Sequence, residues 1–143
     1  MMYRKNPWQA YKQAAAQTAS PGQLVLMLYD GTLKFLNSAL AGFELEDPLE
    51  YNQTISNNIL KAQAIIDELS VSLDMDAGGE FSDKMRGLYD YMDRRLVEAN
   101  VSKTPEGIHE VVKHVTILRD AWREMLDQGS VDGQGQPSQL ASA

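Results

Sequence analysis

The chain has 143 residues, of which 43% are hydrophobic and none is cysteine, and it carries a net charge of −7 at pH 7. This length predicts one domain with its own core, and the lack of cysteine excludes disulfides and thiolate metal sites and fits a reducing compartment. The negative charge disfavours nucleic acid as a partner, because an acidic protein repels phosphate groups.

Three places in the sequence combine a capping side chain with a following proline, and each precedes a run of residues with helical apolar spacing: Ser20-Pro21, Asp47-Pro48 and Thr104-Pro105. The capping oxygen accepts a hydrogen bond from an amide of the first helical turn that has no partner within the helix. Proline is tolerated at the first helical position because its missing N–H would have no partner there. Gln23 and Glu50 lie three residues beyond two of the caps and predict reciprocal capping boxes.

Helices are expected along most of the chain. Residues 5–18 are rich in alanine and glutamine and predict a short helix in which Trp8 and Tyr11 lie one turn apart. Four long helices are expected at residues 21–44, 48–75, 80–100 and 105–128. A turn at 77–79 separates the second from the third. Residues 129–143 consist mainly of Gly, Ser, Gln and Pro and predict a disordered tail.

The last three long helices each carry one main apolar stripe. In the helix at 48–75 the stripe residues alternate in steps of four and three: Ile55, Ile59, Ala62, Ile66, Leu69 and Leu73. Such stripes and the short connections are typical of helices packed nearly antiparallel. The sequence therefore predicts an all-α fold, an antiparallel up-down four-helix bundle at 20–128, with a short N-terminal helical arm or cap at 1–19 and a disordered C-terminal tail at 129–143.

The first long helix carries more apolar surface than one stripe provides. At about 100° per residue, its apolar side chains cover an arc of roughly 200°, where an amphipathic helix usually shows a little over 100°. The helix at 48–75 has a second apolar line opposite its core stripe: Leu49, Leu60, Ala64 and Val71. Two interpretations stay open. Either the first helix is central and is covered by the arm through Trp8 and Tyr11, or part of this surface is a groove for a partner helix with the arm as a removable cover.

The sequence offers no convincing catalytic or metal site. His109 and His114 are five residues apart and lie about 140° apart around a helix, so they cannot share one metal ion. Neither a glycine-rich phosphate loop nor a serine–histidine–acid arrangement stands out. We therefore expect a protein that is not an enzyme and that needs neither a metal nor a cofactor. A histidine phosphotransfer domain is the alternative from another class, because such domains are also small acidic four-helix bundles.

Charge and hydropathy also bear on location and partners. Residues 1–11 lack the apolar stretch of a signal peptide, and the longest apolar run, residues 24–29, is far shorter than the about 20 residues of a membrane span. We expect a cytoplasmic protein without membrane insertion. Between residues 44 and 83 there are ten acidic residues and one basic residue, Lys61. This charge keeps the protein soluble or contacts a basic client or export component.

Several stretches, in their order and spacing, resemble the flagellar secretion chaperones of the FliS type. The longer ones are AYK at 10–12, TASPGQL at 18–24, MLYDG at 27–31, KAQAIIDEL at 61–69, LYDYM at 88–92 and LRDAW at 118–122. The resemblance runs from about residue 8 to residue 125. It implies a four-helix bundle that binds the disordered C-terminal segment of flagellin in the cytoplasm, blocks premature polymerisation and keeps the client competent for export.

The resemblance also implies roles for individual residues. In such proteins an N-terminal arm lies over a hydrophobic pocket and moves when the client binds, and Trp8 and Tyr11 correspond to the apolar residue and the tyrosine of that arm. Trp8 is a departure, since a smaller aliphatic residue is more usual there. On the bundle, the candidates for the pocket or groove are Leu24, Leu28, Tyr29 and Leu60. Binding of another flagellar or regulatory protein is a further alternative, and contact with the flagellar export gate stays open.

Overall fold

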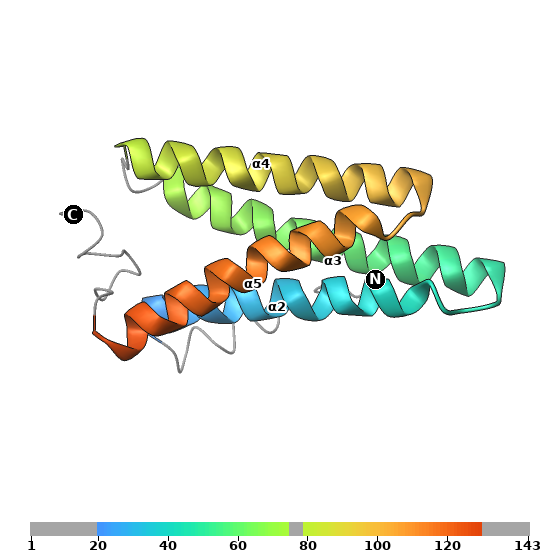
Figure 1. Ribbon diagram of the computed structural model, residues 1–143, viewed down its shortest axis with the longest axis horizontal. Coiled ribbons are helices and arrows are strands. Elements are labelled where there is room, and N and C mark those ends of the chain that lie inside the picture. The colour runs from blue at the N-terminus through green and yellow to red at the C-terminus, as the bar shows by residue number, and fades with distance from the viewer. Residues whose placement is uncertain (1–19, 75–78, 130–143) are drawn as a thin grey trace, which may run out of the picture.

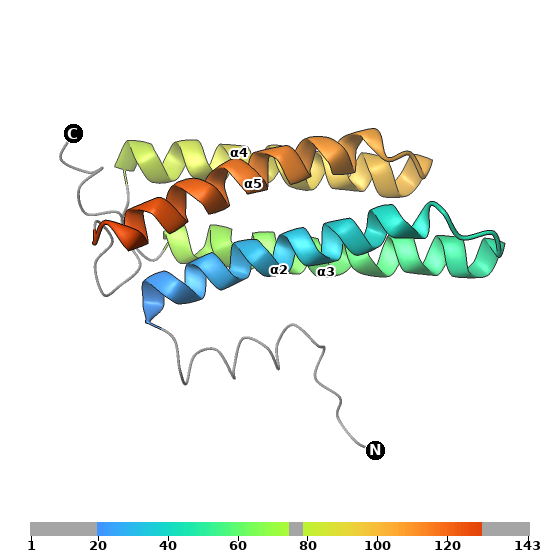
Figure 2. The same ribbon diagram turned by 60° about the horizontal axis from the view of Figure 1, so that its bottom comes forward.

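The computed structural model describes residues 20–74 and 79–129, and nearly all of them lie in four helices (Figure 1). The helices are α2 (Pro21–Gly42), α3 (Pro48–Asp74), α4 (Gly79–Ser102) and α5 (Glu106–Asp127). Each packs against the helices before and after it in the chain, and α5 returns to pack against α2. Successive helices run in opposite directions (Figure 2). The predicted all-α antiparallel four-helix bundle is therefore confirmed, whereas the arm at 1–19 and the tail at 130–143 lie outside the described residues.

The first two predicted helix starts are confirmed. Ser20 caps α2 with a complete capping box: its Oγ accepts from the amide of Gln23 at 3.2 Å, and the Gln23 side chain accepts from the amide of Ser20 at 3.3 Å. At the start of α3, Asp47 Oδ2 accepts from the amide of Glu50 at 2.9 Å. Only this half of the second box is formed. Both helices thus begin where a side chain satisfies an otherwise unpaired amide.

The predicted cap at Thr104 is wrong. The Thr104 hydroxyl pairs with the Ser102 hydroxyl at 2.8 Å, and Pro105 stands at the cap position of α5 without a side-chain hydrogen bond. The cause lies in the end of α4, which continues two residues past the expected Asn100. Lys103 takes a left-handed conformation (φ 52°), and the Thr104 amide donates back to the Ala99 carbonyl at 3.2 Å. This closing turn engages Thr104 before α5 begins.

The core lies along the axis of the bundle, and all four helices contribute to it. Its largest fully buried side chains are Leu36, Ile55, Ile59, Ile65, Ile66, Met92, Leu96, Ile108, Val111 and Val115. Every residue of the predicted α3 stripe up to Leu69 is buried, and Leu73 packs against the core from its end. The α3 stripe thus points inward, as expected.

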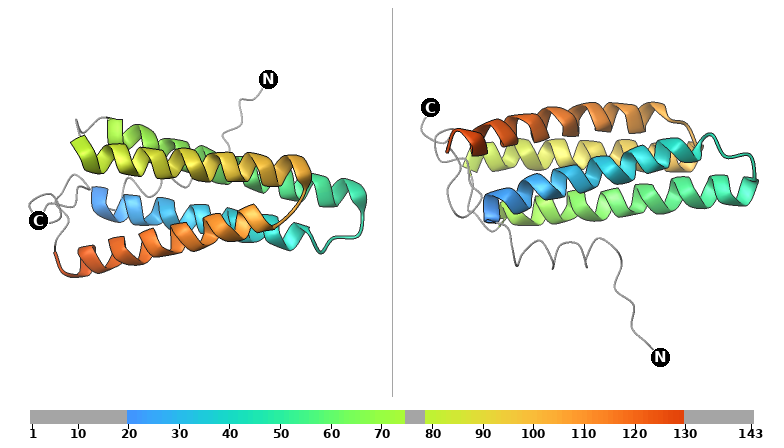
Figure 3. Two further views of the ribbon diagram at one scale, coloured as in Figure 1. Left: turned by 45° about the horizontal axis from the view of Figure 1, so that its top comes forward. Right: turned by 90° about the horizontal axis from the view of Figure 1, so that it is seen from below.

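The wide apolar arc of α2 has a structural explanation, because α2 lies between α3 and α5 (Figure 3). On the α3 side, a β-carbon on Gly31 would lie 3.2 Å from Ile65 Cδ1, so the two helices are in close contact there. On the α5 side, Trp122 Nε1 donates to the Gly22 carbonyl at 2.8 Å. Packing against α3 and α5 accounts for much of the apolar arc of α2. Part of the surface that α2 and α3 form together stays exposed.

Candidate functional site

An exposed apolar line runs along α3 on the side opposite the core. Leu49, Leu60 and Val71 are 63%, 55% and 53% exposed. Successive members of this line are 11 residues apart, so they lie on nearly the same side of α3. The first and the last are about 33 Å apart along the helix axis. Isolated exposed apolar side chains are common, but three along one line form an apolar face that no other helix of the described residues covers.

Partly buried residues of the neighbouring helix α2 extend this apolar face beyond α3. Phe35 contacts Lys61 of α3, Leu24 lies 11 residues earlier on nearly the same side of α2, and both are partly covered. The Lys61 ammonium of α3 lies 5.5 Å from the centre of the Phe35 ring, within the range of a cation–π contact. We call the set Leu24, Phe35, Leu60, Ala64 and Val71 the α2–α3 surface. All five residues are apolar, and Lys61, whose ammonium contacts the Phe35 ring, borders them.

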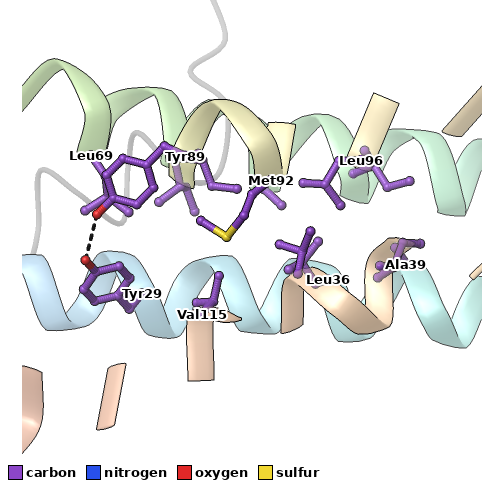
Figure 4. Close-up of a cluster of buried hydrophobic side chains, with 14 of the residues drawn as sticks. Tyr29, Leu36, Ala39, Leu69, Tyr89, Met92, Leu96 and Val115 are labelled. Atoms are coloured by element: carbon purple, nitrogen blue, oxygen red, sulfur yellow. Dashed lines mark hydrogen bonds between the residues drawn. The ribbon is translucent and has the colours of Figure 1, made fainter. Parts of the chain in front are cut away.

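The structure separates the candidates that the sequence grouped together. Leu28 and Tyr29 are core residues, each 4% exposed, whereas Leu60 lies outside on α3 and Leu24 is intermediate. The hydroxyl of Tyr29 lies 2.7 Å from that of Tyr89 in the bundle interior, and burial raises the pKa of both groups (Figure 4). Client contact by any of these residues stays a prediction. Trp8 and Tyr11 lie outside the described residues.

Three residues of the α2–α3 surface, Phe35, Ala64 and Val71, were not among the sequence candidates. Phe35 belongs to the wide apolar arc of α2, where periodicity alone does not distinguish buried from exposed positions. Val71 belonged to the second apolar line of α3, and its 11-residue spacing from Leu60 was the signal that pointed to it. In the folded bundle Val71 is 53% exposed, whereas Phe35 is partly buried against the core.

A polar cluster on the opposite side of the molecule joins α4 to α5. Glu110 accepts hydrogen bonds from the Tyr91 hydroxyl and from Arg95 Nε, both at 2.6 Å. These two donors lower the pKa of Glu110. The hydrogen bond from Tyr91 to Glu110 raises the pKa of Tyr91. His114 Nε2 lies 3.7 Å from the carboxylate, and His109 is exposed in the first turn of α5. The cluster is a bridge between helices, with no nucleophile beside a base.

Two further findings concern the described parts of the chain as a whole. No three histidine, aspartate or glutamate side chains within 20–74 and 79–129 gather in a way that could hold a metal ion. In the same residues, none of the helices combines the length and the hydropathy required to cross a bilayer.

Known proteins resemble this chain over nearly its whole length. The sequence model of the family described as "Flagellar protein FliS" matches residues 4–129. The flagellar secretion chaperone FliS of Bacillus subtilis is 41% identical over 131 residues, which cover 92% of this chain and 94% of that protein. The proteins of the same name from Salmonella typhimurium and Escherichia coli are 35% and 36% identical. They match 90% and 87% of this chain and 96% and 93% of their own lengths.

Proposed function

The chain belongs to the FliS family of flagellar secretion chaperones, which are not enzymes, and we propose that its client is flagellin, bound in the cytoplasm through the disordered C-terminal segment. The observation that carries this proposal is the α2–α3 surface with its exposed Leu60 and Val71. A disordered client that folds into helices on such a surface buries apolar side chains on both partners. The phosphotransfer alternative gains no support, because the family is one of chaperones.

The length of the exposed apolar line on α3, from Leu49 to Val71, suits a disordered client. Ordering such a segment costs about 2–5 kcal/mol or more of the gross interaction energy. The apolar line on α3 spans about 33 Å, so it offers several docking points to one extended or helical segment. Contacts distributed in this way offset the ordering cost and still allow release at the export apparatus. The chaperone then acts by covering apolar faces that would otherwise pack against other flagellin subunits.

We further propose that the arm at residues 1–19 covers this surface in the free protein and gives way to the client. Trp8 and Tyr11 are the residues of the arm that would compete with the client's apolar side chains. A cover of this kind lowers the apparent client affinity, because binding must displace a populated closed state. It also keeps the surface of the empty chaperone away from other proteins.

Co-purification tests the identity of the client and its binding segment. The full chain is expected to retain full-length flagellin and to lose flagellin that lacks its C-terminal helix-forming segment. Equal retention of the two flagellins would place the binding segment elsewhere, and retention of neither would favour another flagellar or regulatory client. A Leu60→Asp chaperone should retain less full-length flagellin, and Ile117→Asp is its matched control, because Ile117 is as exposed as Leu60, at 57% against 55%, but lies on α5.

A further inference from the structure

An acidic side chain interrupts the exposed apolar line of α3. Asp67 is exposed, and it follows Leu60 by seven residues and precedes Val71 by four. At about 100° and about 1.5 Å per residue, it lies within about 40° of both side chains around the helix. Along the axis it is about 10 Å from Leu60 and about 6 Å from Val71. The line thus presents a negative charge between two apolar side chains.

The surroundings of Asp67 supply no cation to balance this charge. Among the residues that the structure describes, no lysine, arginine or histidine forms an ion pair with Asp67. Lys61 is the one basic residue between positions 44 and 83, against ten acidic residues, and its ammonium lies over the Phe35 ring on the α2 side. A partner that covers the apolar line therefore meets a carboxylate that it must either leave unpaired or pair with a cation of its own.

We propose that the client segment docks as a basic amphipathic helix, with a lysine or arginine opposite Asp67 and apolar side chains opposite Leu60 and Val71. The inference rests on the proposed function, because it takes the α2–α3 surface as the binding site. Covering an unpaired carboxylate costs free energy, and a cation on the client removes that cost and adds an attraction. Asp67 is then the residue that selects among apolar helices.

The position of Asp67 also predicts the spacing of side chains in the client. A client helix that lies along α3 repeats the spacing of the residues it contacts, so its cation is about seven residues from one apolar contact and about four from the other. The order of the two intervals depends on the direction of the client helix. Apolar contacts alone would accept several registers along the line, whereas the aspartate disfavours each register that places an apolar or acidic side chain against it.

Calorimetric titration of the full chain with the flagellin C-terminal peptide tests the charge contact. Asp67→Lys should weaken binding about tenfold or more in dilute buffer, because two cations then face each other, and Asp67→Asn should weaken it less. The loss should shrink at about 0.5 M salt, where charges are screened over a few ångströms. Each lysine and arginine of the peptide is then replaced by glutamate in turn. One such peptide should bind the wild type more weakly and recover affinity with Asp67→Lys.

Glu124→Lys is the matched control, because it changes the net charge equally on α5. Glu124 is exposed and follows the exposed Ile117 by seven residues, the same spacing as that of Asp67 from Leu60. This variant should bind like the wild type. Equal weakening by the two lysine substitutions, or none by Asp67→Lys, would overturn the inference.

Two further outcomes separate this inference from its premise. Tighter binding by Asp67→Lys would mean that the aspartate holds the arm and not the client, and it would overturn the inference. A peptide whose binding is weakened by Leu60→Asp but not by Asp67→Lys would also overturn it, while leaving the proposed function intact. A wild type that does not bind the peptide at all would contradict the proposed function itself.

Discussion

The hydroxyl oxygens of Tyr29 and Tyr89 lie 2.7 Å apart inside the bundle and join α2 to α4, two helices that are not adjacent in the ring of four (Figure 4). Removing one hydroxyl leaves the other buried without this partner, which costs about 1–3 kcal/mol. Tyr29→Phe and Tyr89→Phe should therefore each lower the free energy of unfolding. The double variant should lose clearly less than the sum of the two. Urea unfolding of the four proteins measures this coupling, and strictly additive losses would contradict it.

The close approach of α4 and α5 depends on Gly107. A β-carbon at this position would lie 2.8 Å from the main-chain oxygen of Arg95, and a backbone atom cannot move aside as a side chain can. Gly107→Ala should lower the free energy of unfolding by about 1–3 kcal/mol.

Gly87→Ala is the control for that substitution, because Gly87 lies within α4 and a β-carbon there meets nothing within 4 Å. It should raise the free energy of unfolding by about 0.5–1 kcal/mol, since alanine favours a helix over glycine. Denaturant unfolding measures both changes. Unchanged stability of the Gly107 variant would show that the contact of α4 with α5 is not as tight as described, and a loss of stability in the Gly87 variant would show that position 87 is not open.

Acid should weaken the link between α4 and α5 through Glu110. The hydrogen bonds from Tyr91 and Arg95 lower the pKa of Glu110, so its contribution is present above the ordinary glutamate pKa and is lost as the pH falls through the lowered value. Glu110→Gln should therefore lower the melting temperature at neutral pH and bring it closer to the wild type in acid. Glu46→Gln, at an exposed position in the α2–α3 connection, should have little effect at either pH. Thermal unfolding across this pH range checks the result, and parallel curves for wild type and Glu110→Gln would refute it.

The sequence sufficed for the architecture because the signals that define it are local. Ser20 and Asp47 mark their helices because each accepts from an amide three residues away. The prediction at Thr104 was wrong because its hydroxyl pairs with that of Ser102 in the turn that ends α4. In that turn Lys103 has a positive φ, which residues other than glycine rarely adopt. Local patterns thus locate helices well and their exact ends less well.

The candidate site was harder to predict for a different reason. Tyr29 lies on the wide apolar arc of α2, and only the arrangement of the helices shows that it is inside the bundle, whereas Leu60 lies opposite the core stripe of its own helix. Periodicity gives the angle of a side chain around its own helix but not which neighbour covers that angle. The 11-residue spacing of Leu60 and Val71 was informative because, within residues 20–74 and 79–129, no helix covers that side of α3.

Displacement of the arm can be measured by hydrogen exchange on the full chain. Backbone amides around residues 8–17 should become less protected when a peptide of the flagellin C-terminal segment is added, because the client replaces the arm. Tyr11→Ala should change the peptide affinity more than the melting temperature. Unchanged protection of these amides, or a large melting shift at constant affinity, would rule out the arm as a removable cover.

The central claim is that the α2–α3 surface receives the client, and calorimetric titration of the full chain with the flagellin C-terminal peptide tests it most directly. The wild type should bind saturably, and Leu60→Asp should weaken binding about tenfold or more, equivalent to about 1.4 kcal/mol, because a charge replaces a buried apolar contact. Ile117→Asp should bind like the wild type. Absence of binding by the wild type, or equal weakening by the two substitutions in folded protein, would contradict the claim.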